Sequence, residues 1–226
     1  WIDFTAQSFA DSYADMTRYA RSLRKDVLLE LNGPRMWAYQ PTMDPARILQ
    51  VGEACWDENE SGKVGFTKGK LNTRIISYKY ARTMNNLVFS YITTPLEAAE
   101  SMSFNLDCFG CICWYEYGNI QERPGVNIPI EPKVIPYAKF YNENREIYNS
   151  GKVVADIAVL RSYPSIAFGG TENWNRVTAV ERALIESSSC FEIINESMLK
   201  DLNKYRLLVL AGCTALSDNH IMQIKE

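Results

Sequence analysis

The sequence of 226 residues contains a single histidine, His220, and no long apolar run. Ser-His and Cys-His pairs both need a histidine base, and His220 falls in the last expected helix, so catalysis by either pair is nearly excluded. No segment approaches the roughly 20 apolar residues of a membrane span, and no targeting segment opens the chain. We therefore expect a soluble protein without a membrane partner. No signal fixes its compartment, and the cytoplasm is favoured.

A basic cluster is also missing. The 24 Lys and Arg residues are scattered along the chain and outnumbered by 27 acidic residues, which gives a formal charge of -3. Nucleic acid is therefore not an expected partner, because tracking phosphates requires concentrated positive charge. The chain has no G-x-G-x-x-G or Walker sequence, and Gly169-Gly170 before a helix is only a weak phosphate-loop signal. We expect no cofactor.

The six cysteines do not form a metal-binding pattern. Cys108, Cys111 and Cys113 are closely spaced, but zinc sites usually combine two separated pairs of Cys or His ligands, and no second pair is present. All but Cys190 lie in apolar surroundings near expected strands, so we expect these five to be buried free thiols, and we expect no metal. Gly212-Cys213 follows an apolar strand, as the nucleophile of an amidotransferase does, but without a partner histidine a packed turn is the better interpretation.

The chain alternates between segments with helical and strand-like periodicity. The expected helices are 3–24, 69–85, 96–106, 137–149, 175–187, 198–202 and a last one capped by Ser217 or Asp218; the expected strands are 27–31, 48–54, 87–92, 110–117, 153–161, 191–194 and 207–211. Short apolar strands separated by helices predict an α/β fold with parallel sheets. The first four helix-and-strand units fit the second half of a (β/α)8 TIM barrel, and an open doubly wound sheet fits the same pattern.

A boundary is expected near residue 151. Residues 119–136 have no regular period, and Ser150-Gly151-Lys152 separates two runs of helices and strands. We assign residues 1–150 to the half-barrel and 152–226 to a truncated three-layer α/β domain. The chain begins with Trp1 and stops at Glu226 inside an unfinished helical pattern, so we expect a fragment.

Carboxylates and aromatic side chains gather where the expected strands end. Such a combination suits a sugar, because carboxylates bind its hydroxyl groups and aromatic rings contact its apolar faces. Glu53 is the candidate catalytic residue, although a hydrogen-bonded acid at a strand end would look the same. Glu30 would either point into the barrel or pair with a neighbour such as Arg35. The candidate substrate-binding residues are Asn32, Trp56, Asp57, Tyr91, Trp114, Tyr115 and Glu116. Solvent exposure for Asp57, a core position for Trp114 and turn chemistry for Asn32 are the simpler alternatives.

Three segments resemble the glycoside hydrolases that join a barrel to a trimerisation domain, the family-42 type beta-galactosidases and related proteins. They are residues 3–32, the stretch from Gly110 to Glu116, and above all the stretch from Lys204 to Asp218. The resemblance implies a carbohydrate substrate, a flavodoxin-like domain from residue 152 onward, and a homo-oligomer, often a trimer. It also implies an acid/base residue on a strand before Trp1 and a nucleophilic Glu on the seventh strand.

This chain departs from that pattern at the seventh strand. Segment 87–92 is followed by Thr93 and Thr94, and it contains no Glu. Either Glu53 on the sixth strand substitutes, or the strand count is off by one, or the protein is not a conventional hydrolase with two Glu residues. The expected function is hydrolysis of O-glycosidic bonds in oligo- or polysaccharides. The alternative is a noncatalytic carbohydrate-binding or assembly protein, and an amidotransferase-like enzyme centred on Cys213 is disfavoured.

Overall fold

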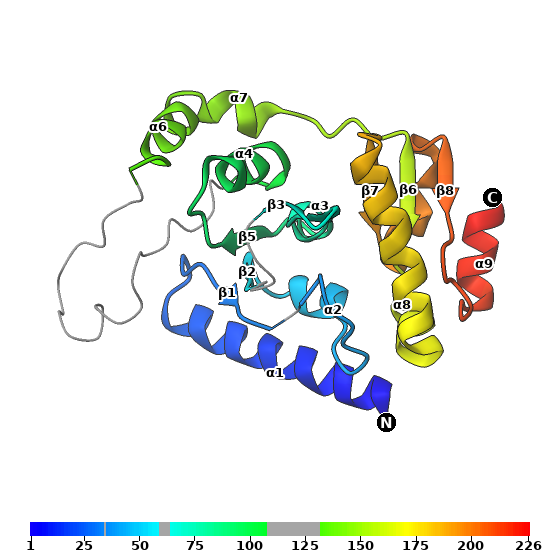
Figure 1. Ribbon diagram of the computed structural model, residues 1–226. Coiled ribbons are helices and arrows are strands. Elements are labelled where there is room, and N and C mark those ends of the chain that lie inside the picture. Colours follow the sequence, from blue (N-terminus) through cyan, green and yellow to red (C-terminus); the bar gives the residue numbers. More distant parts are fainter. Residues whose placement is uncertain (34, 59–63, 108–131) are drawn as a thin grey trace.

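The computed structural model describes residues 1–33, 35–58, 64–107 and 132–226 (Figure 1). The helices are α1 (Ile2–Leu23), α2 (Pro45–Leu49), α3 (Ile75–Thr83), α4 (Pro95–Phe104), α6 (Ile135–Glu143), α7 (Arg145–Ser150), α8 (Tyr163–Glu186), the 3-10 helix η1 (Glu196–Lys204) and α9 (Asp218–Lys225). The strands are β1 (Glu30–Leu31), β2 (Ala54–Asp57), β3 (Gly65–Thr67), β4 (Lys70–Asn72), β5 (Leu87–Ser90), β6 (Ile157–Leu160), β7 (Phe191–Ile194) and β8 (Leu207–Val209). The fold is mixed α/β. Across these ranges no helix is both long and apolar enough to span a membrane.

The first sheet is parallel and has the strand order β1-β2-β5, which follows the order along the chain. Side chains alternate between its two faces. Cys55 and Val88 are buried on one face, where they pack with Tyr78 of α3. Trp56 and Phe89 project from the other face and are only half-buried. We call the latter the open face.

The second sheet has the order β7-β6-β8, with all strands parallel and β6 in the middle. The chain therefore crosses from one side of β6 to the other after β7. Val159 and Ile193 pack with Val177 of α8 on one face. Leu160 and Leu199 belong to a second cluster, with η1 and α9, on the other face. Opposite faces covered by different helices make this part of the chain three layers deep.

Helix α3 lies between the two sheets (Figure 1). Its Tyr80 and the β7 residue Phe191 belong to one buried cluster that contains side chains from both sheets. Two hydrogen bonds join α3 to β7: Lys79 Nζ donates to Phe191 O at 2.8 Å, and Thr83 Oγ1 donates to Ile193 O at 3.1 Å. The segments before and after residue 151 thus share a hydrophobic core.

The structure corrects the expected strand 48–54. Residues 45–49 form α2, and the strand begins only at Ala54. Asp44 caps this helix by accepting a hydrogen bond from Ala46 N at 2.9 Å, and Pro45 occupies the first turn. Both are helix-start signals, but a short apolar run does not distinguish a strand from a buried helix.

The expected helix 69–85 is also wrong at its beginning. Residues 65–72 form the antiparallel hairpin β3-β4, and α3 starts at Ile75. The hairpin turns at Lys68 and Gly69, which both have positive φ angles, of 51° and 75°. Such a turn favours glycine, which is present here as Gly69. This local signal outweighed the apolar spacing further along the segment, which had predicted a helix from residue 69.

Other expected elements are confirmed or shifted. The helix 3–24, the helix 96–106, the strand 191–194 and the Ser217 cap are found within two residues of their expected positions. The strand 27–31 shortens to β1, 137–149 divides into α6 and α7, and α8 begins twelve residues earlier than the expected 175. The expected strand 110–117 lies outside the described residues.

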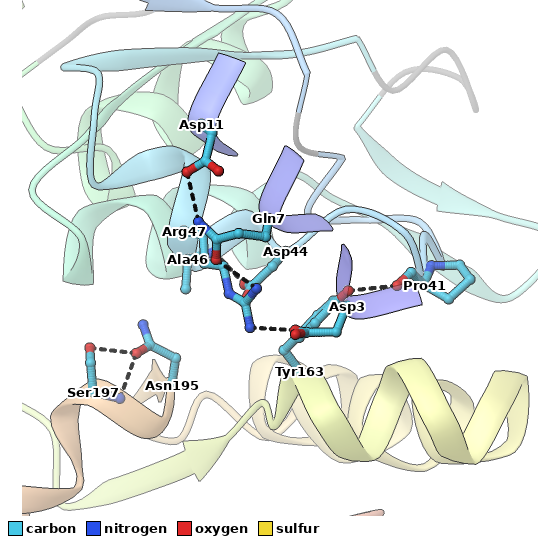
Figure 2. Close-up of polar contacts among 10 residues, drawn as sticks. All are labelled: Asp3, Gln7, Asp11, Pro41, Asp44, Ala46, Arg47, Tyr163, Asn195 and Ser197. Carbon is cyan, nitrogen blue, oxygen red and sulfur yellow. Dashed lines mark hydrogen bonds and ion pairs between the residues drawn. The ribbon is translucent and has the colours of Figure 1, made fainter. Parts of the chain in front are cut away.

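A polar junction joins α1, α2 and the beginning of α8 (Figure 2). Arg47 donates to Asp3 Oδ1 at 2.7 Å and to Gln7 Oε1 at 3.0 Å, and its guanidinium lies 5.7 Å from the ring centroid of Tyr163. The Tyr163 hydroxyl donates to Pro41 O at 2.7 Å. Asp44 lies beside this group, with Oδ2 3.1 Å from Arg47 Nε.

Stability should depend on pH through Asp44. Burial raises the pKa of Asp44 to about 6, although Arg47 and the backbone of α2 lower it in part. Because this pKa lies above its unfolded value, the folded state favours the protonated form of Asp44. The resulting contribution to the free energy of unfolding is fully present below about pH 4 and is lost as the pH rises through 6. Asp44→Asn keeps a capping oxygen without the charge, so its free energy of unfolding should not fall over this pH range. Relative to the original protein, the variant should therefore become more stable by about 2–3 kcal/mol as the pH rises from about 4 to above 6.

Urea unfolding of both proteins at about pH 4.5 and about pH 7.5 measures this gain. Asp218→Asn, in the first turn of α9, is the matched control because its side chain is exposed. A stability difference for Asp44→Asn that is the same at both pH values would contradict the prediction.

Candidate functional site

The carboxyl edge of the first sheet brings several expected site residues together. Asn32 follows β1, Asp57 ends β2, and Tyr91 follows β5. Because the strands are parallel, all three residues lie at the same edge, where α/β proteins usually place their sites. Asn32 is exposed, Tyr91 is half-buried and Asp57 is fully buried.

Glu53 lies at the opposite edge, so the expectation that it follows a strand is wrong. It immediately precedes β2, because residues 45–49 are helical. Its carboxylate accepts a hydrogen bond from Leu29 N at 3.0 Å and forms an ion pair with Arg21. These contacts attach α1 and the approach to β1 to the beginning of β2. Glu53 therefore has a structural role in this fold.

Trp56 is the centre of an aromatic group on the open face. The strand register pairs Trp56 with Phe89, and Tyr91 lies two residues beyond Phe89 on the same face. The Trp56 ring centroid is 5.8 Å from that of Phe89 and 5.6 Å from that of Tyr91, with tilted planes. Glu30 of β1 pairs with Ala54 and so shares this face. We call Glu30, Trp56, Phe89 and Tyr91 the Trp56 platform.

Glu30 supplies the carboxylate of the platform. Burial raises its pKa above the usual value, a hydrogen bond with Trp56 opposes this shift, and the negative charge of Glu58 adds to it. The side chain remains exposed, so a ligand can reach it. An accessible acid with a raised pKa beside an aromatic surface is a typical arrangement of a functional site. From the sequence, alternation along β1 could place Glu30 on a face of the sheet. The strand register of the structure was needed to show that Trp56 is its neighbour on that face.

Asp57 faces away from the platform. It shares the opposite, helix-covered face with Ser90, and both side chains are 0% exposed. Ser90 Oγ lies 2.7 Å from Tyr78 OH. Burial raises the pKa of Tyr78 to about 12, and the charge of Asp57 contributes to this shift. The alternative of a solvent-exposed Asp57 is therefore wrong, because its side chain lies on the face that the helices cover.

Sequence reasoning missed a group of buried charges next to this edge. Arg74 Nη1 lies 3.4 Å from Glu97 Oε1, and Arg74 N donates to Glu100 Oε2 at 3.2 Å. Thr73 Oγ1 donates to Glu100 Oε1 at 2.6 Å. Glu97 also completes a capping box with Thr94, and this spacing is visible in the sequence. The contacts hold α3 against α4 and leave these carboxylates little access to a ligand.

The carboxyl edge of the second sheet is closed by a side chain. Asn173 Nδ2 donates to Ser165 O at 2.8 Å and to Thr214 Oγ1 at 2.7 Å. Gly212 approaches so closely that a Cβ atom there would lie 2.7 Å from Asn173 O. A Cβ at Gly169 would collide with the Asn173 side chain. This edge is the topological switch point, where such sheets usually bind ligands, and here protein atoms fill it.

Cys213 shows no feature of a nucleophile. Its Sγ lies 3.7 Å from Leu160 O, and burial raises its pKa to about 11. Reactive cysteines have lowered pKa values, so the packed turn describes this position better than an amidotransferase centre does. Cys55 is buried as expected, Cys213 is only partly buried, and Cys190, for which burial was not expected, is exposed.

The remaining expected site residues lie outside the described residues. They are Trp114, Tyr115 and Glu116, together with the closely spaced cysteines Cys108, Cys111 and Cys113. Within the described ranges, no group of three or more His, Cys, Asp or Glu side chains is arranged to hold a metal ion.

Comparisons of this chain with models of protein families, with curated proteins and with solved structures find no match. The function therefore has to be inferred from the geometry of the chain itself.

Proposed function

We propose that this chain belongs to a carbohydrate-active protein of the glycoside hydrolase type, with the Trp56 platform as its sugar site. The supporting observation is the half-buried Trp56 ring, which packs against two aromatic rings of the neighbouring strand segment and lies beside the accessible carboxylate of Glu30. The apolar face of a sugar ring would contact Trp56 and Tyr91. Its hydroxyl groups would donate hydrogen bonds to Glu30.

Glu30 takes the catalytic role first assigned to Glu53. A raised pKa suits a general acid, which must hold its proton near neutral pH. Glycoside hydrolysis commonly uses two carboxyl groups. Glu58 is close enough to raise the pKa of Glu30, and it follows β2 at the carboxyl edge. Glu58 is therefore the proposed second carboxylate.

The topology agrees with the architecture of such enzymes. The first sheet is parallel, its strands follow chain order and one of its faces is covered by helices. These features support the second half of a (β/α)8 barrel. The order β7-β6-β8 supports the beginning of a flavodoxin-like sheet, in which the first strand lies between the second and the third. Filling of its switch point by Asn173 suits an assembly role better than a ligand-binding role, and we propose that this domain supports a homo-oligomer.

A noncatalytic carbohydrate-binding protein is the second candidate. The absence of a Glu at the end of β5 favours this candidate, because the resemblance implies a nucleophilic Glu there. That position is occupied by Ser90 and Tyr91. A platform that binds sugar without hydrolysing it would have the same aromatic rings and would not need a second carboxylate.

Titration with galactose, lactose and an aryl β-galactoside tests the proposal, with the heat of binding measured by isothermal titration calorimetry. Trp56→Ala should weaken binding by about ten-fold or more, because an aromatic contact surface is lost. Phe66→Ala is the matched control, since Phe66 is an exposed aromatic residue on the β3-β4 hairpin. Equal affinity in the original protein and Trp56→Ala, or no binding of any of the sugars, would refute the proposal.

Release of the aryl group separates the two candidates. A hydrolase should lose turnover in Glu30→Gln while still binding the glycoside. A noncatalytic protein should bind the glycoside without turnover in any variant.

A further inference from the structure

One cavity among the described residues has no role in the proposed sugar site. It has a volume of about 730 Å³ and lies between α3, α4, the linker that follows α7, and the beginning of β7. In Figure 1 this linker runs from α7 to β6 above α3 and α8. The cavity opens at the amino end of β7, so it is separate from the carboxyl edges of both sheets.

The cavity is positively charged in a protein of net negative charge. Lys79, Arg82 and Lys152 line it, and within the described ranges none of the three has a carboxylate within 4.0 Å. Among the described residues that line the cavity, Glu192 is the only acidic one. Its carboxylate is engaged by Lys204 at 3.3 Å and by the Tyr205 hydroxyl. The cations therefore outnumber the acids in a chain whose formal charge is -3.

Lys79 is fixed at the apolar wall of this cavity. Its ammonium donates to Phe191 O and lies 4.4 Å from the Phe191 ring centroid and 5.3 Å from that of Phe104. Burial lowers the pKa of Lys79, because the ammonium has lost part of its water. An anion entering the cavity would replace that lost hydration with a direct charge interaction.

We propose that this cavity binds a small organic anion, with its apolar part against Phe104 and its charged group toward Lys79, Arg82 and Lys152. The volume falls within the range of roughly 300–1,000 Å³ that is typical of small-molecule sites. Such sites combine apolar walls with a few polar groups. Here Phe104 and Phe191 are among the lining residues, together with the three cations. A carboxylate, sulfonate or phosphate on an apolar body has the required chemistry.

Cys190 lines the cavity and is exposed, so its alkylation reports on the occupant. The probe is 8-anilinonaphthalene-1-sulfonate, and N-phenyl-1-naphthylamine is its uncharged counterpart. Peptide mass analysis follows the modification of Cys190 by iodoacetamide. The sulfonate should slow this reaction by about five-fold or more, and the neutral compound at the same concentration should slow it much less.

The double variant Arg82→Gln/Lys152→Gln should lose this protection, with both cations removed from the cavity. It should also lower the ratio of iodoacetate to iodoacetamide reactivity at Cys190, because only the first reagent is negatively charged. Lys200→Gln, an exposed substitution on η1 outside the cavity, is the matched control and should behave like the original protein. Equal protection by both compounds, or undiminished protection in a folded double variant, would overturn the proposal. Neither outcome depends on the Trp56 platform.

Discussion

Glu181→Ala is expected to destabilise the fold by about 3–5 kcal/mol, because it leaves the guanidinium of Arg161 buried without its carboxylate. The two side chains are 4% and 0% exposed and form a bidentate pair, with Arg161 Nε donating to Glu181 Oε1 at 3.0 Å. Unfolding in urea, followed by circular dichroism, measures the loss.

Arg161 also connects the two sheets. It directly follows β6, and its Nη1 donates to Met36 O at 2.6 Å in the loop after β1. Its guanidinium lies 5.2 Å from the ring centroid of Tyr80 and 5.0 Å from that of Trp174. Loss of the Glu181 carboxylate should therefore disturb the contacts of Arg161 with the loop after β1, with α3 and with α8.

The double variant Arg161→Met/Glu181→Leu distinguishes two sources of the destabilisation: the loss of the ion pair itself and the burial of an unpaired Arg161 charge. Replacing both partners by apolar side chains of similar volume removes the uncompensated charge, so much of the stability should return. If the double variant is less stable than Glu181→Ala, the explanation by a stranded charge is wrong.

Glu97→Ala is expected to cost about 3 kcal/mol, since it removes a helix cap and a buried partner of Arg74 together. Glu97 Oε2 accepts hydrogen bonds from Thr93 N at 2.8 Å and Thr94 N at 3.0 Å. Glu97→Gln can still accept these bonds and should cost less. Thr94→Ala, which loses only its own half of the capping box, should cost about 1 kcal/mol.

The loss in Glu97→Gln should also depend on pH. Burial raises the pKa of Glu97, but hydrogen bonds from Thr93 and the charge of Arg74 outweigh this and hold the pKa below its usual value. The charged form therefore stabilises the fold above the unfolded pKa, and this contribution is lost as the pH falls through the folded pKa. Urea unfolding at neutral and acidic pH should show the original protein and Glu97→Gln converging in acid. A gap that widens in acid would refute this assignment.

Local signals were sufficient where one periodicity dominated. The spacing of Phe9, Tyr13 and Met16 predicted the long helix that the structure shows as α1. The apolar run Phe191–Ile194 is a strand with the same limits. Ser217 was expected as one of two possible caps, and its side chain accepts a hydrogen bond from His220 N.

Local signals failed where two elements competed for a short segment. Ile48 to Val51 is apolar enough for a strand, but the Asp44 cap and Pro45 start a helix before it. The error moved Glu53 to the wrong edge of the sheet. The turn at Lys68-Gly69 similarly replaced the first part of a helix by a hairpin.

The sequence by itself determined the α/β class, the parallel strands and the presence of acidic and aromatic residues near strand ends. Composition and periodicity depend on near neighbours in the chain, so these features were readable. Only the tertiary structure decided which carboxylate meets which ring. The register between β1, β2 and β5 places Glu30 with Trp56, turns Asp57 to the helix side and leaves Glu53 with Arg21. Strand pairing joins residues more than 20 positions apart, and a shift of one residue would exchange the faces, so no local pattern could have settled it.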